Sequence, residues 1–220
     1  NYAALGRPKV VLACSSCFQV FKARLPEVEL VSLWTLLAEK GLPETAVHIP
    51  TATIAIHDPC TTRGETAVQD NVRHLVGQLG YDITDRPRSR ATTTCCGFGG
   101  LMVCANRSLA KKVVAQRIAE SPADYVTYCA VCRDYFAAQG KPTRHLLDLI
   151  FGSPGNGGHN GGRGPGFSQK HENRARLKRQ LLQERWGETV TGQEADAAIQ
   201  LNLSQDVLAI MEDRLILVED

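Results

Sequence analysis

Cysteine is the residue type in this chain whose spacing most strongly suggests chemistry. The 220 residues include eight cysteines, and five of them form a single thiol, a vicinal pair followed by glycine, and a Cys-x-x-Cys, at Cys60, Cys95, Cys96, Cys129 and Cys132. Thiolates are soft ligands that select zinc, copper(I) or iron–sulfur clusters over magnesium or calcium. The pattern therefore predicts a thiolate-ligated metal centre.

The number of thiols favours a cluster over a single ion. A structural zinc ion takes four ligands in a tetrahedron, and five cysteines exceed that number. Adjacent residues of an extended chain point in opposite directions, so Cys95 and Cys96 can face one site only where the backbone turns sharply. Gly97, Gly99 and Gly100 allow such a turn. We expect an iron–sulfur cluster, with zinc and metal-free redox thiols as the alternatives.

The other three cysteines are expected to have different roles. Cys14 and Cys17 form a second Cys-x-x-Cys, which we interpret as part of a second, incomplete metal site. Cys104 lies in an apolar segment, and we expect it to be a buried structural thiol, because free cysteine packs as a small hydrophobe. Disulfides are disfavoured, since disulfide-dense domains are usually small and core-poor whereas this chain is 43% hydrophobic. A reducing, cytoplasmic location is therefore expected.

His57 and Asp58 precede the first cysteine of the pattern and allow two interpretations. They could simply end a strand with a turn before Pro59. Alternatively, they could contact the metal ligands as hydrogen-bond partners or supply a proton beside the centre, and Gly97 could support the ligands in the same way. The sequence identifies no catalytic residue.

The elements that must position these residues alternate along the chain. Strands are expected at residues 9–14, 51–57, 81–84 and 125–128, and helices at 18–23, 66–79 and 109–119. This alternation predicts an α/β fold with a largely parallel sheet. Because α/β sheets place their sites at the carboxyl edge, five thiols that are distant in sequence can meet there.

The two Cys-x-x-Cys motifs belong to an internal repeat. Each follows a strand-like run and precedes an aromatic residue, Phe21 or Phe136, at the same offset of 115 residues. A Leu-rich helix follows each motif, at residues 32–37 and 145–150. We therefore expect a tandem cysteine-rich fold, in which residues 1–50 are the end of a truncated first copy and residues 51–151 are a complete second copy.

The remainder of the chain is expected to be a linker and a helical extension. Eight of the fifteen residues from Gly152 to Gly166 are glycine, which predicts a flexible linker over residues 152–168. Residues 169–220 are expected to be mainly helical and truncated, with a basic helix over 169–186 and a second helix capped by Ser204. The basic helix carries an apolar stripe at Leu177, Leu181, Leu182 and Trp186.

Bulk properties exclude two classes of partner. The formal net charge is only +2, which is not the strong positive charge of a nucleic-acid-binding protein. No segment reaches the roughly 18 consecutive apolar residues that a membrane-spanning helix requires, so we expect no direct span.

Residues 51–151 resemble the cysteine-rich, or Cys-Cys-Gly, domain of the heterodisulfide reductase B subunit and its relatives. The matching positions are His57-Asp-Pro-Cys60, Cys95-Cys-Gly97 with Gly99-Gly100, and Cys129-Ala-Val-Cys132. The resemblance implies a noncubane [4Fe-4S] cluster, in which two smaller iron–sulfur units share a thiolate bridge. Some relatives bind a cubane cluster or zinc in one copy.

The resemblance also implies a function. The chain would be the iron–sulfur subunit of a heterodisulfide-reductase-like oxidoreductase of anaerobic metabolism, transferring electrons to a disulfide or a similar acceptor, with a small-molecule disulfide or thiol as its substrate. Its partners would be other redox subunits, of the flavin or ferredoxin-like kind. One alternative is an electron relay in a glycolate, lactate or glycerol-3-phosphate dehydrogenase that feeds quinone. Another is a zinc-stabilised interaction module.

Overall fold

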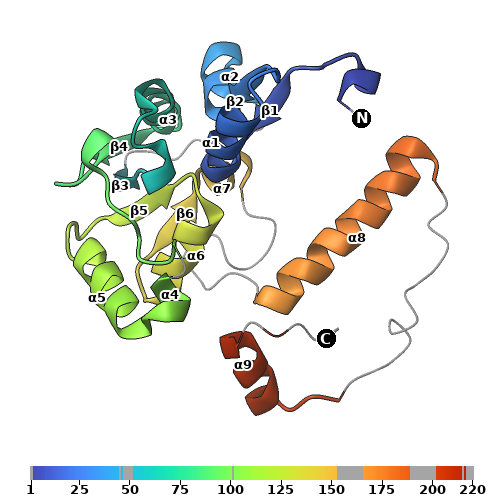
Figure 1. Ribbon diagram of the computed structural model, residues 1–220. Helices are drawn as coiled ribbons and strands as arrows, with labels where there is room; N and C mark the ends of the chain where they lie inside the picture. The colour runs from blue at the N-terminus through green and yellow to red at the C-terminus, as the bar shows by residue number, and fades with distance from the viewer. Residues whose placement is uncertain are drawn as a thin grey trace. The chain divides into compact units, whose positions relative to one another are not determined.

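The computed structural model describes residues 2–44, 46, 52–100, 102–152, 166–188, 202–214 and 216. Its contacts divide the chain into two compact units, Asn1–Arg163 and Gly164–Asp220 (Figure 1). The expected Gly-rich linker lies, at positions 153–165, outside the described residues. The expected boundaries of the repeats and of the linker stay predictions.

The first unit is built on a four-stranded parallel sheet (Figure 1). Its strands are β3 (Ala52–His57), β4 (Tyr81–Thr84), β5 (Asp124–Thr127) and β6 (Thr143–His145), in the spatial order β4-β3-β5-β6. A separate two-stranded sheet pairs β1 (Val10–Leu12) with β2 (Leu30–Ser32), also in parallel. The predicted α/β fold with a largely parallel sheet is confirmed.

Helices connect these strands. Seven α-helices are described in the first unit: α1 (Ser15–Arg24), α2 (Leu33–Lys40), α3 (Thr66–Gln78), α4 (Met102–Ala105), α5 (Arg107–Ile118), α6 (Ala130–Ala138) and α7 (Leu146–Phe151). Short 3-10 helices are η1 (Ala3–Leu5), η2 (Cys60–Thr62) and η3 (Arg90–Thr92). The sequence did not predict β2 and β6, because each has three residues and neither carries the alternating pattern of a longer strand.

The two faces of the sheet are packed differently. Ile54 and Ile56 of β3 belong to a large apolar core with residues of α2, α3 and α7, whereas Ala55 belongs to a second core with residues of α5 and α6. In β5, Val126 belongs to the first core and Tyr125 to the second. This division follows from the alternation of side chains along a strand. The second core also contains cysteines.

The order of the strands creates a switch point. The chain runs from β3 through α3 to β4 on one side, and later returns to place β5 on the other side of β3. Connections therefore leave the carboxyl ends of β3 and β5 in opposite directions, and a crevice between such strands is where open α/β sheets bind ligands. Cys60 follows β3 at this edge and Cys129 follows β5.

Two stretches share one element order, namely β1-α1-β2-α2 and β5-α6-β6-α7. Cys14 is the N-cap residue of α1, and Cys129 is the N-cap residue of α6. Likewise Ser32 caps α2 and His145 caps α7. The internal repeat is therefore present in the local structure as well as in the cysteine spacing.

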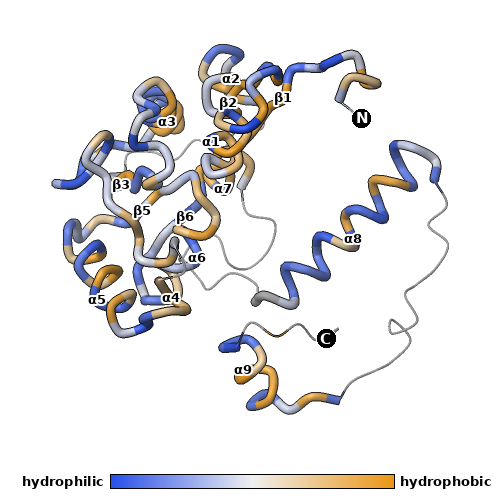
Figure 2. Tube along the Cα trace, viewed as in Figure 1, coloured by the Kyte–Doolittle hydropathy of each residue, from blue (hydrophilic) through white to orange (hydrophobic). Residues whose placement is uncertain are grey.

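The second unit contains helices α8 (Phe167–Trp186) and α9 (Gln205–Arg214). Ser204 accepts a hydrogen bond from the Val207 N–H at 3.3 Å, so its predicted capping role is confirmed. Figure 2 shows α8 as mostly hydrophilic with short hydrophobic stretches, and Leu177, Leu181 and Trp186 of its apolar stripe are exposed. Within the described residues, none of the helices combines the length and apolar character that a membrane span requires.

Candidate metal centre

The five cysteines of the central pattern come from three segments at the carboxyl edge of the sheet. Cys60 begins η2, three residues after His57, the last residue of β3. Cys129 caps α6 directly after β5, and Cys132 lies in the first turn of that helix. Cys95 and Cys96 lie in the loop that follows η3. The sheet thus gathers residues that are up to 72 positions apart in sequence.

The five thiols form a continuous string. Each thiol shifts the pKa of the next one in the order Cys60, Cys95, Cys96, Cys132 and Cys129. The Sγ atoms of Cys96 and Cys132 are 3.4 Å apart. The structure therefore brings together all five of the residues that the sequence proposed for one site.

Two thiols of the string are held in a form close to thiolate. Hydrogen bonds from the Cys60 and Cys96 thiols, and from backbone N–H groups of Gly97 and Gly99, hold the pKa of Cys95 far below its usual range. A hydrogen bond with Cys132, together with N–H groups at the start of α6, lowers the pKa of Cys129 to about 6. Thiolate is the form that binds metal.

Their neighbours are shifted in the opposite direction. The hydrogen bond to Cys95 raises the pKa of Cys60, and the hydrogen bonds to Cys129 and Cys96 raise the pKa of Cys132. Thiols crowded in this way cannot all ionise without a compensating positive charge, because like charges disfavour one another. A metal centre would supply that charge.

The chemistry of the donor set can be compared with that of known metal sites. Among the described residues, no group of three or more His, Cys, Asp or Glu side chains is arranged so that it could hold a metal ion. A multi-iron cluster accepts ligands from different directions around its metal atoms. The five soft ligands fit an iron–sulfur cluster more closely than tetrahedral zinc.

A glycine turn lets both vicinal cysteines join the string. Gly97 has φ +103°, a backbone conformation that residues other than glycine rarely adopt. Its N–H donates a hydrogen bond to Cys95 Sγ at 3.3 Å. A Cβ atom at Gly97 would lie 3.0 Å from the carbonyl oxygen of Ala110. Gly100 also has a positive φ, of +65°. The predicted turn after Cys96 is therefore present.

Asp58 ties the three cysteine-bearing segments together. Its buried carboxylate accepts hydrogen bonds from Arg73 at 3.1 and 2.9 Å, from the Tyr128 hydroxyl at 2.9 Å and from the Arg90 N–H at 2.8 Å. The Thr93 hydroxyl donates to the Asp58 carbonyl at 2.6 Å. Tyr128 immediately precedes Cys129, and Thr93 is two residues before Cys95. With its oxygens so occupied, Asp58 orders the site.

Sequence reasoning missed the residues that hold this arrangement. Arg73 lies on α3, and Arg86 lies in the loop after β4, where its Nη2 is 3.0 Å from Nδ1 of His57. No local pattern distinguishes these arginines from solvated ones, because their partners are distant in sequence. The side chains of both are largely buried, and this is the signal that a structure supplies.

Cys14 and Cys17 are exposed at the start of α1, where the Cys17 N–H donates to Cys14 Sγ at 3.4 Å. A hydrogen bond of 2.6 Å between the hydroxyls of Ser15 and Thr61 joins this helix start to the residue after Cys60. The second Cys-x-x-Cys therefore lies on the side of the unit where η2 begins. A role in a second metal site stays a prediction.

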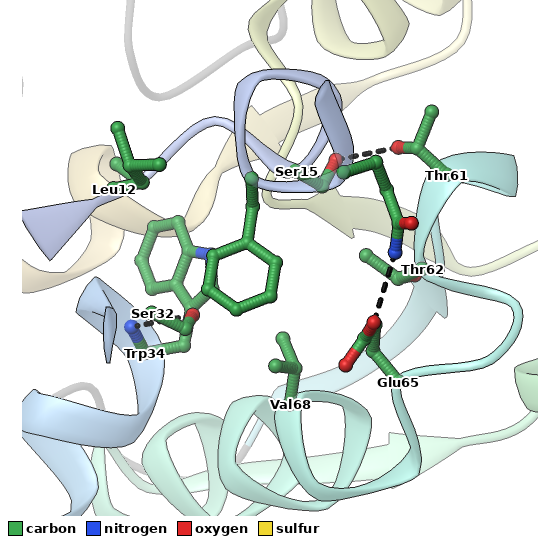
Figure 3. Close-up of a pocket in the computed structure, with 11 residues that line it drawn as sticks. Leu12, Ser15, Ser32, Trp34, Thr61, Thr62, Glu65 and Val68 are labelled. Carbon is green, nitrogen blue, oxygen red and sulfur yellow. Dashed lines mark hydrogen bonds between the residues drawn. The ribbon is translucent and has the colours of Figure 1, made fainter. Parts of the chain in front are cut away.

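A small hollow lies beside this junction. Its lining includes Leu12, Phe18, Trp34 and Val68 as apolar members, and the hydroxyls of Ser15 and Thr61 meet at its rim (Figure 3). The Trp34 indole N–H is buried and has no hydrogen-bond partner within the described residues. The hollow is thus lined by residues of both the N-terminal stretch and the segment that follows Cys60.

The expectation for Cys104 is wrong. The structure places it on the single-turn helix α4, where it is exposed rather than buried. Its neighbours Met102 and Val103 are the partly buried residues of this turn. A short apolar run on a helix can direct only one side toward the core, so apolar neighbours in sequence did not imply burial.

Comparison with known proteins places this site in a family. Residues 54–136 match the family of cysteine-rich domains termed CCG, and this stretch contains all five cysteines of the string. The chain is also 27% identical over 134 residues to the glycolate oxidase iron-sulfur subunit of Escherichia coli (strain K12), a match that covers 59% of this chain and 32% of that protein. The chain thus spans about a third of the length of this curated relative. Residues 54–136 belong to the CCG family of cysteine-rich domains.

Proposed function

We propose that Cys60, Cys95, Cys96, Cys129 and Cys132 hold an iron–sulfur cluster, and that the chain relays electrons within a larger oxidoreductase. The observation that carries this proposal is the string of five sulfurs at the switch point of a parallel sheet. A relative that is itself an iron-sulfur subunit adds support. When bound, the cluster supplies one-electron transfer.

The chain's own residues prepare the site for a cluster. Cys95 and Cys129 present ligands whose pKa is already lowered by hydrogen bonds, so less free energy is needed to deprotonate them. Backbone N–H groups of Gly97 and of the α6 N-terminus point at these sulfurs, and such hydrogen bonds tune a cluster's reduction potential. Cys96 and Cys132 are buried, which limits access of water to that side.

The first candidate role is an electron relay for the oxidation of an organic acid. The named activity of the Escherichia coli relative supports it. Oxidation of an α-hydroxy acid to an α-keto acid releases two electrons and two protons. A flavin subunit would take up the pair, and this chain would pass the electrons singly toward an acceptor such as a quinone, directly or through ferredoxin-like subunits.

The second candidate role is the reduction of a small-molecule disulfide, as in heterodisulfide reductases. The partial exposure of Cys60 and Cys95 supports it, because a bound cluster would have a side open to a substrate. The exposed apolar side chains of Phe98 and Val131 lie close in sequence to the ligands and could contact such a molecule. Reduction of a disulfide would consume two electrons and two protons and yield two thiols.

Metal and sulfide analysis of the anaerobically purified chain tests the proposed cluster. We expect about four irons with labile sulfide per chain and no stoichiometric zinc, since five soft thiolates exceed what a zinc site uses. An electron paramagnetic resonance spectrum would then distinguish a noncubane from a cubane cluster. One equivalent of zinc, with no visible absorption after reconstitution with iron and sulfide, would overturn the proposal in favour of a zinc-stabilised interaction module.

The two roles are separated by the choice of oxidant. The reduced, cluster-loaded chain is mixed with a water-soluble quinone or with a small organic disulfide, and reoxidation is followed by visible absorption. Faster reoxidation by quinone supports the relay to an organic-acid dehydrogenase. Reoxidation by the disulfide with release of two thiols supports the reductase role.

A further inference from the structure

His57 is buried on the same side of the sheet as the thiols. It is the last residue of β3, and its side chain is fully buried. Ala55, two residues earlier, packs in the core that contains Cys96 and Cys132, and alternation along the strand places His57 on that face as well. The His57 ring meets Phe136 of this core edge-on, with 4.8 Å between centroids.

Arg86 determines which nitrogen of His57 carries the proton. Nη2 of Arg86 lies 3.0 Å from Nδ1 of His57. A guanidinium has N–H donors and no acceptor, so Nδ1 must be the acceptor in this bond. An imidazolium has no acceptor nitrogen, so the ring that accepts from Arg86 is neutral. A neutral ring that accepts at Nδ1 carries its proton on Nε2.

This Nε2–H has no hydrogen-bond partner within the described part of the chain. Leaving a buried donor unpaired costs about 1–3 kcal/mol, so native proteins rarely leave one without an acceptor. The two ring nitrogens point away from each other, so Nε2 faces away from Arg86. His57 shares its face of the sheet with Cys96 and Cys132, and Nε2 forms no hydrogen bond with any thiol of the described residues. The acceptor is therefore to be sought at the thiol site.

Arg86 is itself held firmly. Its side chain is fully buried, and its Nη2 is 3.4 Å from a carboxylate oxygen of Glu120. The guanidinium carbon also lies 4.7 Å from the centroid of the Tyr125 ring. Within the described residues its Nε and Nη1 have no hydrogen-bond partner, so Nη2 is the nitrogen that contacts both His57 and Glu120.

We propose that Arg86 is a positioning residue that locks His57 in the Nε2–H tautomer, so that this N–H can donate a hydrogen bond to a sulfide of the cluster that the five thiols would hold. The proposal rests on the proposed cluster for the identity of the acceptor. Hydrogen bonds to cluster sulfurs stabilise the reduced, more negative state, so this bond raises the reduction potential.

The test uses two substitutions of Arg86 and a matched control in the full chain. Arg86→Met removes the donor while keeping much of the apolar stem, and Arg86→Lys keeps a side chain that can only donate. Arg144→Met is the control, because Arg144 also stacks on a tyrosine, with its guanidinium carbon 5.4 Å from the Tyr81 centroid, and it donates to that hydroxyl at 3.1 Å.

The first readout is the nitrogen NMR spectrum of the histidine rings in the metal-free, reduced chain. We expect His57 as a single Nε2–H tautomer in the wild type, in Arg86→Lys and in Arg144→Met, and as a mixture in Arg86→Met. A wild-type ring protonated on Nδ1 would overturn the proposal, and this measurement requires neither a cluster nor a variant. It is therefore independent of the test of the proposed function.

The second readout is the reduction potential of the cluster, titrated anaerobically after equal iron content has been verified. We expect a lower potential in Arg86→Met than in the wild type, recovery in Arg86→Lys and no change in Arg144→Met. Equal potentials in the wild type and Arg86→Met would contradict the hydrogen bond to sulfur. If Arg86→Met does not fold, His57→Leu replaces it, because leucine has no donor. An unchanged potential in Arg86→Lys together with a lowered one in His57→Leu is then the supporting result, and an unchanged potential in His57→Leu overturns the proposal.

Discussion

At the scale of single residues, the five thiols differ in burial and in acidity although they share one site. Cys96 and Cys132 are buried in the core on one face of the sheet, whereas Cys60, Cys95 and Cys129 are partly exposed. Cys95 and Cys129 have a lowered pKa, because their neighbours and nearby N–H groups donate to them. A cluster ligated here would have one side in the protein core and one side accessible.

Replacing any of the five thiols by serine should change the cluster. Serine keeps the volume but offers a harder and far more weakly acidic ligand, so each variant should lose iron or alter the electron paramagnetic resonance signal. In a four-thiolate zinc site, one member of the Cys95–Cys96 pair would be a spectator with unchanged metal content. The control is Cys104→Ser, which should be silent because Cys104 is exposed on α4.

Gly97→Ala should disturb the turn that directly follows the vicinal pair Cys95 and Cys96. Both Gly97 and Gly100 have positive φ, so alanine at either position costs about 1–2 kcal/mol of folding free energy. Only at Gly97 would the new Cβ also approach a backbone oxygen, at 3.0 Å, whereas at Gly100 it meets open space. Iron content and urea unfolding should therefore fall more in Gly97→Ala. Equal losses in the two variants would contradict this explanation.

At the scale of elements, buried polar contacts link the cysteine-bearing loops to one another. Asp58 bonds to α3 through Arg73, to η3 through Arg90 and to the end of β5 through Tyr128. Tyr128 directly precedes Cys129, and Arg90 lies on η3, shortly before Cys95. Arg73 lies on α3, the helix that follows Cys60 and η2. A single carboxylate thus sets the relative positions of loops that are separated in sequence.

Asp58→Asn should destabilise the first unit strongly. It removes one partner of a buried ion pair, in which the side chain of Asp58 is 0% exposed and that of Arg73 is 10% exposed. Breaking such a pair costs about 3–5 kcal/mol where the remaining charge is left unpaired. Arg73 keeps a second ion pair, with its Nη2 2.6 Å from Oδ1 of Asp85, so we expect a loss of about 3 kcal/mol, at the lower end of this range. The free energy of unfolding in urea measures this loss. Asp70→Asn, which removes the more exposed pair with Arg90, should change stability by less than about 1 kcal/mol.

The cap of α7 should make stability depend on pH. His145 Nδ1 accepts from the Leu147 N–H at 3.2 Å, and burial lowers the pKa of His145 below its usual value of 6.5. His145 therefore binds a proton more readily in the unfolded chain than in the folded chain. The free energy of unfolding falls as the pH drops below about 6.5. His145→Ser copies the cap that Ser32 provides for α2. We expect this variant to lose less stability than the wild type between pH 7.5 and pH 5.5, as measured by urea unfolding.

At the scale of the whole molecule, every residue assigned to the site lies in the first of the two units. The two apolar cores described above also consist entirely of residues from this unit. The helices of the second unit are largely polar, with a few exposed apolar side chains such as Leu177 and Trp186. We therefore expect that the second unit can be deleted without loss of cluster binding.

A chain shortened to residues 1–152 should retain the cluster. Its iron and sulfide content after anaerobic reconstitution should equal that of the full chain, since the five thiols and their hydrogen-bond partners remain. The midpoint of unfolding should change little for the same reason. A shortened chain that folds but binds no iron would mean that the second unit contributes to the site.

Much of the site could be anticipated from the sequence, because the chemistry of a ligand belongs to its side chain. Five cysteines, two of them adjacent and followed by Gly97, exceed the four ligands of a structural zinc site in any fold. The alternation of β3 and the helical period of α3 are local patterns, so the parallel α/β fold and the gathering of thiols at one edge could be predicted as well.

Only the tertiary structure decided how those residues are connected. The strand order β4-β3-β5-β6 and the sequence of sulfurs along the string depend on contacts between segments that are distant in the chain. The same holds for Arg86 beside His57 and for Arg73 on Asp58, since neither arginine has a neighbour in sequence that marks it as buried. For Cys104 the prediction of burial was wrong, because its apolar neighbours suggested a core position whereas its place on α4 leaves it exposed. Ligand type is a local property, whereas burial and hydrogen-bond partners are set by the packing of the whole unit.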